Sequence, residues 1–94
     1  MAKTVERVLL FNGKTLYVLS IGRSNGEVVW VELSDLGFSW SLFADLEAGQ
    51  ALVVFKDVII HMTVKADIDD ALDRIEGIVN DCIVVAEKEE REEG

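Results

Sequence analysis

Residues 4–33 read TVERVLLFNGKTLYVLSIGRSNGEVVWVEL, in which three apolar runs rich in β-branched residues are separated by two Asn-Gly pairs. Asn-Gly suits the positive φ angles of a two-residue hairpin turn, and β-branched and aromatic residues favour extended strands. The stretch therefore predicts three consecutive antiparallel strands over 4–11, 14–21 and 27–33. They are joined by tight turns at Asn12-Gly13 and at 22–26.

The middle of the chain is harder to interpret. In residues 34–50, Leu42, Phe43 and Leu46 have helical spacing, whereas alternating serines and large apolar residues would also suit an extended edge segment. We expect irregular chain followed by one or two turns of helix. Two further strands are expected over 51–55 and 58–65.

Acidic residues open the last part of the chain. Asp67 suits the N-cap of a helix, and further acids in its first turns favour the positive end of the helix dipole. One apolar stripe with helical spacing follows, made up of Ile68, Leu72, Ile75, Val79, Cys82 and Ala86. We expect one helix over 67–88 and a frayed acidic tail over 89–94. The alternative is a helix that ends near Val79, with a last strand over 82–86.

These elements predict a single α+β domain over residues 1–94, since a chain of this length suffices for one hydrophobic core. The β-rich part, 1–66, is expected to form an antiparallel β-meander or small barrel of about five strands with a C-terminal α-helix. The strands are apolar on both faces, and one helix covers only one face. The second face would then be buried by barrel closure, by residues 34–50 or by another subunit.

The run Asp45-Leu46-Glu47-Ala48-Gly49-Gln50, followed by two strands and an acid-opened helix, resembles the small hydrogenase-maturation chaperones. The resemblance covers the second half of the chain and implies an OB-like barrel with a trailing helix. Position 2 is Ala2, where that family has the cysteine on which metal delivery depends. The resemblance therefore implies a small barrel and no function.

The negative charge is concentrated at one end of the chain. Residues 1–66 carry six basic and seven acidic side chains, and residues 67–94 carry three and eleven, for a net charge of −9. Such a field repels phosphate backbones, so we expect no direct nucleic-acid binding. With one cysteine, no evident signal peptide and no apolar run of membrane-spanning length, we expect a cytoplasmic protein without membrane association.

Two sets of residues are candidate sites. Asp67, Asp69, Asp70 and Asp73 could bind Ca²⁺ or Mg²⁺ weakly, or could be a solvated helix start; no other cofactor is expected. Trp30, Phe38, Trp40 and Phe43 are candidate core or interface anchors. The single histidine, His61, and the single cysteine, Cys82, are expected to be structural.

No assembled nucleophile–base pair is evident, so we expect no enzyme activity. The sequence instead indicates a small acidic interaction or assembly module that associates with itself, most simply as a homodimer, or with another protein. The alternatives are a divalent-cation-binding protein and an acidic mimic that binds a basic partner surface.

Overall fold

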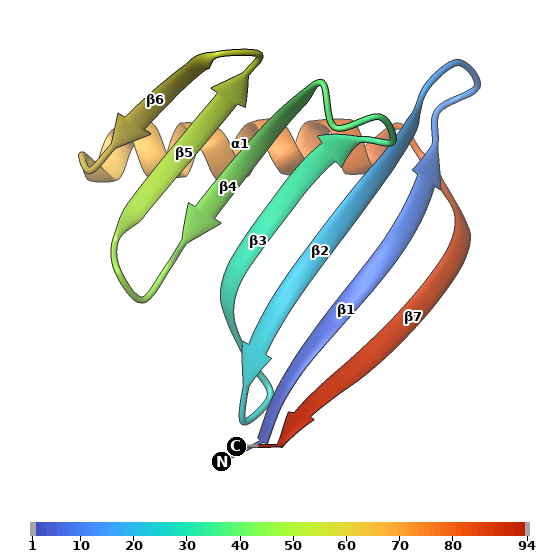
Figure 1. The fold of residues 1–94 in the computed structure, drawn as a ribbon, viewed down its shortest axis with the longest axis horizontal. Coiled ribbons are helices and arrows are strands. Elements are labelled where there is room, and N and C mark those ends of the chain that lie inside the picture. Colours follow the sequence, from blue (N-terminus) through green and yellow to red (C-terminus); the bar gives the residue numbers. More distant parts are fainter. Residues whose placement is uncertain (1, 94) are drawn as a thin grey trace.

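In the computed structural model, which describes residues 2–93, seven strands form one antiparallel sheet that a single helix crosses (Figure 1). In chain order the elements are β1 (Ala2–Phe11), β2 (Leu16–Ser24), β3 (Glu27–Asp35), β4 (Trp40–Asp45), β5 (Gln50–Phe55), β6 (Val58–Met62), α1 (Lys65–Asn80) and β7 (Ile83–Glu93). The expected α+β class is confirmed. Among the described residues, no helix is both long and apolar enough to cross a membrane.

The strand order is β6-β5-β4-β3-β2-β1-β7, so β1 to β6 each pair with their neighbour in the chain and β7 returns beside β1. Strands β6 and β7 form the two edges of the sheet and lie on opposite sides of it in Figure 1. The prediction of about five strands is too low, and barrel closure is not seen.

The two Asn-Gly turns lie where the sequence predicts them. Gly13 has φ +96°, and Asn25 and Gly26 have φ 52° and 87°. In the first turn, the side-chain oxygen of Asn12 accepts hydrogen bonds from the backbone N–H groups of Lys14 and Thr15, at 2.9 and 2.8 Å. These local interactions close the β1–β2 hairpin without help from the rest of the fold.

The helical turns expected in residues 34–50 are wrong. Strand β3 continues to Asp35, and β4 follows after a short loop. Leu42 pairs with Leu33 on one side and Val53 on the other, and Leu42 and Ala44 are buried on one face of the strand. Two neighbouring strands satisfy the backbone of β4, which outweighs the helical spacing of its apolar residues.

The end of the chain also differs from the preferred prediction. The helix begins at Lys65, its N-cap is Val64 without a side-chain hydrogen bond, and Asp67 lies in the first turn. The predicted helix over 67–88 is wrong, because α1 ends at Asn80. The frayed tail predicted over 89–94 is wrong as far as Glu93, because β7 pairs with β1 to that residue, and residue 94 lies outside the described residues. The alternative of a last strand is the better one. Backbone pairing with β1 orders even the charged residues.

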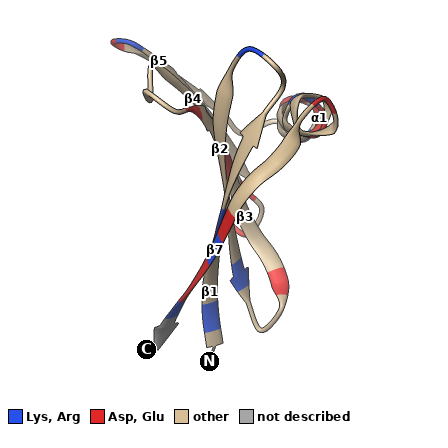
Figure 2. Cartoon of the chain, turned by 90° about the vertical axis from the view of Figure 1, so that its right-hand side faces the viewer, with Lys and Arg blue, Asp and Glu red and all other residues tan. Residues whose placement is uncertain are grey.

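The helix packs across one face of the sheet, as the edge-on view in Figure 2 shows. On that face one row across six strands is entirely aliphatic, comprising Val8, Leu19, Leu33, Leu42, Val53 and Ile60. Ile68, Ala71 and Ile75 of α1 are buried against this side of the sheet. Burial of apolar surface between these two layers forms the core.

The other face of the sheet is mixed rather than apolar throughout. One row comprises Leu9, Val18, Ser34, Ser41, Val54 and Ile59, and the next Arg7, Ser20, Glu32, Phe43, Leu52 and His61. Residues 34–50 lie within the sheet or in its loops and do not cover this face. Two of the three expected means of covering it, barrel closure and residues 34–50, are therefore not found among the described residues.

Candidate functional site

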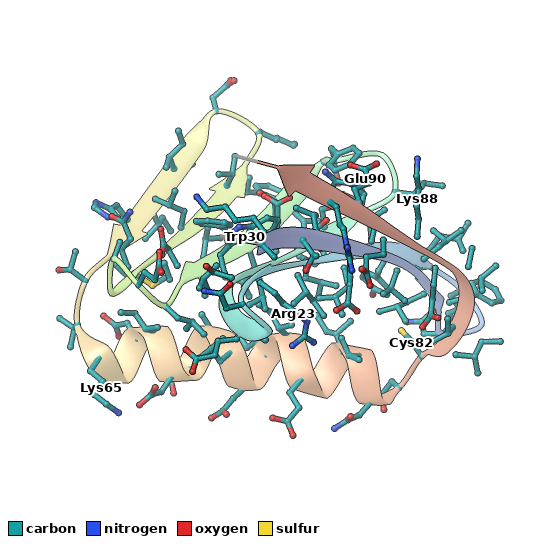
Figure 3. The ribbon with its side chains drawn as sticks, turned by 90° about the horizontal axis from the view of Figure 1, so that it is seen from below. Arg23, Trp30, Lys65, Cys82, Lys88 and Glu90 are labelled. Atoms are coloured by element: carbon teal, nitrogen blue, oxygen red, sulfur yellow. The ribbon has the colours of Figure 1, made fainter. Side chains whose placement is uncertain are left out.

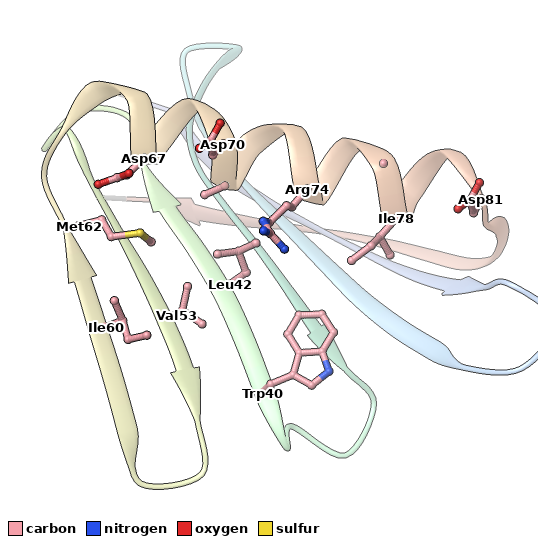
Figure 4. A pocket seen from close by; sticks show the side chains of 12 residues that line it. Trp40, Leu42, Val53, Ile60, Met62, Asp67, Asp70, Arg74, Ile78 and Asp81 are labelled. Carbon is pink, nitrogen blue, oxygen red and sulfur yellow. The ribbon is translucent and has the colours of Figure 1, made fainter.

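A cleft of about 820 Å³ lies between α1 and the strands β4, β5 and β6 (Figure 4). It is lined by Trp40, Leu42, Val53, Ile60, Met62, Asp67, Asp70, Ala71, Arg74, Gly77, Ile78 and Asp81. Ala71 is buried against the strands, whereas an added Cβ at Gly77 would meet no atom within 4 Å. The helix therefore leaves open space beside Gly77.

The walls of the cleft are apolar and its charged groups come from the helix. Trp40 lies on the strand side and packs edge-to-face against Tyr17, with ring centroids 6.1 Å apart. In Figure 4 the guanidinium of Arg74 points from the helix towards the strands, between Leu42 and Trp40. This is an open cleft with apolar strand walls, bordered on the helix side by Arg74 and three aspartates that are all exposed.

The edge strand β6 is apolar and exposed, as is the start of the other edge strand, where Ile83, Val84 and Val85 of β7 are 67%, 56% and 52% exposed. Val58, Ile59 and Ile60 are 57%, 67% and 51% exposed. No residue of this strand is an acid, a lysine or an arginine, and His61 Nε2 lies 2.7 Å from the Gln50 side-chain oxygen. An uncharged apolar edge with unpaired backbone groups is a template for pairing with another strand.

The four aromatic residues proposed as interface anchors do not form one surface. Trp30 and Phe43 pack together on the face away from the helix, with ring centroids 5.9 Å apart. Trp30 also lies over Gly22, where an added Cβ would lie 2.0 Å from the indole nitrogen. Trp40 lines the cleft on the other face, and Phe38 is 66% exposed in the β3–β4 loop.

The four aspartates proposed as metal ligands are also distributed around the helix. Asp69 accepts a 2.8 Å ion pair from Lys65, which raises the pKa of that lysine through the hydrogen bond and the negative charge. Asp67 and Asp70 border the cleft, and Asp73 does not. Within the described part of the chain, no group of three or more histidine, cysteine, aspartate or glutamate side chains is arranged to hold a metal ion.

Asp35 organises the β3–β4 loop. Its carboxylate accepts hydrogen bonds from the Ser39 hydroxyl at 2.5 Å and from the Ser39 backbone N–H at 2.7 Å. The bond from the Ser39 side chain, together with those from the backbone of Trp40 and Ser39, lowers the pKa of Asp35 below its ordinary 3.8. The loop adjoins the β5–β6 turn, where Lys56 N–H donates to the Ser39 carbonyl at 3.5 Å.

Cys82 lies between α1 and β7, at the opposite end of the helical segment from Lys65 (Figure 3). Partial burial, and secondarily the charge of Asp81, raise the pKa of its thiol above 9.0. The thiol is therefore protonated at neutral pH and is a weak nucleophile.

Sequence reasoning missed the two features that stand out in the structure. The stretch Val58-Ile59-Ile60-His61-Met62-Thr63-Val64 contains no acid, lysine or arginine, and this was the available sign of an unprotected edge strand. For the cleft, the available sign was Arg74, the one basic residue in the interior of α1. Neither pattern identifies an edge strand or a cleft until the strand order is known.

No known protein family matches this chain, and neither a curated protein nor a solved structure matches it at a significant level.

Proposed function

We propose that the protein is a small non-catalytic assembly module that forms a homodimer through β6. The observation that carries the proposal is the exposure of Val58, Ile59 and Ile60 on an edge strand without charged residues. Phe55 and Val64, which flank the strand in the chain, are 50% and 60% exposed and enlarge the apolar area. Such an area is a typical mark of a protein–protein contact.

The geometry of β6 favours an isologous pair. If the β6 strands of two copies align antiparallel with Ile60 at the two-fold axis, Val58 of one copy lies opposite Met62 of the partner copy. Ile59 then lies opposite His61 of the partner copy. Each unpaired backbone group gains a partner, and the aliphatic row under the helix continues from one copy to the next.

The opposite edge of the sheet discourages open-ended assembly. Pairing β6 with the charged part of β7 in another copy would place apolar side chains beside Glu87, Lys88, Glu89, Glu90 and Arg91, and the apolar part of β7, residues 83–86, is shorter than β6. Those charges would lose hydration without gaining partners. A closed dimer through β6 is therefore favoured over a filament.

A matched pair of substitutions tests the proposal. Ile59 and Ile83 are both isoleucines that are 67% exposed, on β6 and on β7. We expect sedimentation velocity to show a dimer of the wild-type protein at tens of micromolar. Ile59→Lys is expected to give a monomer, because a lysine on an edge strand resists pairing with another chain, and Ile83→Lys is expected to remain dimeric. A monomeric wild-type protein, or equal behaviour of the two variants, would contradict the proposal.

The two alternative functions stay predictions, since no contact in the structure favours either. Amide shifts of Asp67, Asp69, Asp70 and Asp73 during a Ca²⁺ or Mg²⁺ titration test the cation site. The acidic mimic needs substitutions rather than truncation, because residues 87–93 belong to a strand. Replacing Glu87 and Glu90 by glutamine is expected to weaken the binding of any basic partner that depends on this charge.

The proposed location is the cytoplasm, and it rests on the sequence alone. A single cysteine that lies part-buried at the end of α1 contributes no structural disulfide within the chain. The proposed partner is a second copy of the chain, with no nucleic acid and no membrane involved.

A further inference from the structure

The cleft under α1 has the dimensions and the chemistry of a ligand site. Its volume of about 820 Å³ lies within the range of roughly 300–1,000 Å³ that small-molecule pockets occupy. Apolar side chains form the strand side, including Trp40, Val53 and Met62. The apolar part of a ligand would therefore lie against the sheet.

Arg74 is the polar group directed into this space. No ion pair of Arg74 occurs with any residue that the structure describes. Its ordinary helical partner, Asp70 one turn earlier, points away from the strands in Figure 4, while the guanidinium points towards Leu42 and Trp40. Arg74 is exposed at the cleft, so its donors are hydrated in the free protein and are available to a ligand that lies against the apolar strands.

We propose that this cleft binds a small molecule with an apolar body and a single carboxylate, which Arg74 holds through paired hydrogen bonds. The planar guanidinium matches a planar carboxylate in this way. Asp67, Asp70 and Asp81 on the rim, with the net charge of −9, disfavour an anion of higher charge. A cationic head group would pair with these aspartates instead of Arg74, and the probes below distinguish the two cases.

Three probes with the same chain and different head groups test the proposal, namely decanoate, decanol and decylammonium, each below the concentration at which it forms micelles. Trp40 lines the cleft and Trp30 lies on the other face, so tryptophan fluorescence of a Trp30→Phe protein reports the cleft. We expect decanoate to bind at least about tenfold more tightly than either other probe, as a charge-assisted hydrogen bond implies. Equal binding of decanol, or tighter binding of decylammonium, would overturn the proposal.

Two variants separate the role of Arg74 from that of net charge. Arg74→Gln is expected to weaken the binding of decanoate about tenfold and to leave the affinity for decanol unchanged. Lys65→Gln removes one positive charge from the same helix at a residue that does not line the cleft, and is expected to leave both affinities unchanged. If the two variants weaken decanoate equally, the guanidinium is not the binding group.

A third variant tests the location. Val53→Phe adds volume on the strand wall of the cleft and is expected to weaken the binding of decanoate and of decanol alike. Thermal unfolding checks that this variant is folded. Binding of both probes unchanged from wild type would place the site elsewhere. Ile60 and Met62 of β6 line the cleft, whereas Ile59 does not. Because Arg74 and the strand wall belong to one copy, monomeric Ile59→Lys protein is expected to bind decanoate as the wild type does.

Discussion

The two edges of this sheet are built in opposite ways. Strand β7 is eleven residues long and is mostly charged after Ala86, whereas β6 has five residues with no acid, lysine or arginine among them. Charged edge strands resist pairing with other chains, and apolar ones invite it. Charge therefore protects β7 from Glu87 onward, whereas β6 and the short apolar stretch 83–85 at the start of β7 lack such protection.

The strands behind both edges carry buried residues. Beside β7 lies β1, where Val8 and Leu10 are 8% and 2% exposed, and beside β6 lies β5, where Ala51 is fully buried and Phe55, at the strand end, is half exposed. Figure 1 places β6 and β7 at opposite sides of the sheet. The two edge strands therefore differ in charge more than in the burial of the strands behind them.

The largest expected effect is a difference between the two sides of the sheet in the stability lost when a side chain is truncated. Leu10→Ala, which removes a buried side chain of β1, is expected to lower the free energy of unfolding by about 3 kcal/mol. Ile59→Ala, on the exposed face of β6, is expected to cost less than about 1 kcal/mol. Urea unfolding at a concentration where the protein is monomeric measures both. Similar losses would show that the β6 hairpin is as much a part of the core as β1.

A smaller effect is expected within the charged edge itself. Glu6 of β1 lies directly opposite Glu89 of β7, and Arg7 lies opposite Lys88. Like charges in facing positions destabilise a strand pair, so Glu89→Lys is expected to stabilise the fold by about 0.5 kcal/mol. The same unfolding measurement in low and high salt checks it. A stabilisation that does not shrink in high salt would exclude an electrostatic origin.

The smallest expected effect concerns the loop that adjoins the β6 hairpin. Because hydrogen bonds hold the pKa of Asp35 below its unfolded value, the stabilisation is complete above the unfolded pKa. It is lost as pH falls through the folded pKa. We expect the Ser39 and Trp40 amide shifts to titrate together with a midpoint below 3.8, and Asp35→Asn to abolish the titration. A midpoint at or above 3.8 would mean that these hydrogen bonds do not favour the carboxylate.

The sequence predicts the first three strands because their signals are local. Asn12-Gly13 and Asn25-Gly26 adopt the positive φ angles of their turns at Gly13, Asn25 and Gly26 whatever the rest of the chain does. The strand β4 could not be predicted in this way. Its apolar residues fit a helix equally well, and only the neighbours Leu33 and Val53 decide the outcome.

The end of the chain shows the same limit. The apolar stripe through Cys82 is compatible with a longer helix, but the unpaired edge of β1 captures residues 83–93 as β7. The candidate site depends on that kind of long-range pairing as well. Arg74 and Trp40 meet only because α1 crosses β4, and the exposure of Ile59 follows from the place of β6 at the end of the strand order.

Contacts between the β6 strands of two copies provide the most direct test. In a mixture of isotope-labelled and unlabelled protein, filtered nuclear Overhauser spectra report only contacts between different copies. We expect contacts between Val58 of one copy and Met62 of the partner copy, with none between copies at β7. Contacts between copies at β7, or none at β6 in a sample that sediments as a dimer, would contradict assembly through the uncharged edge.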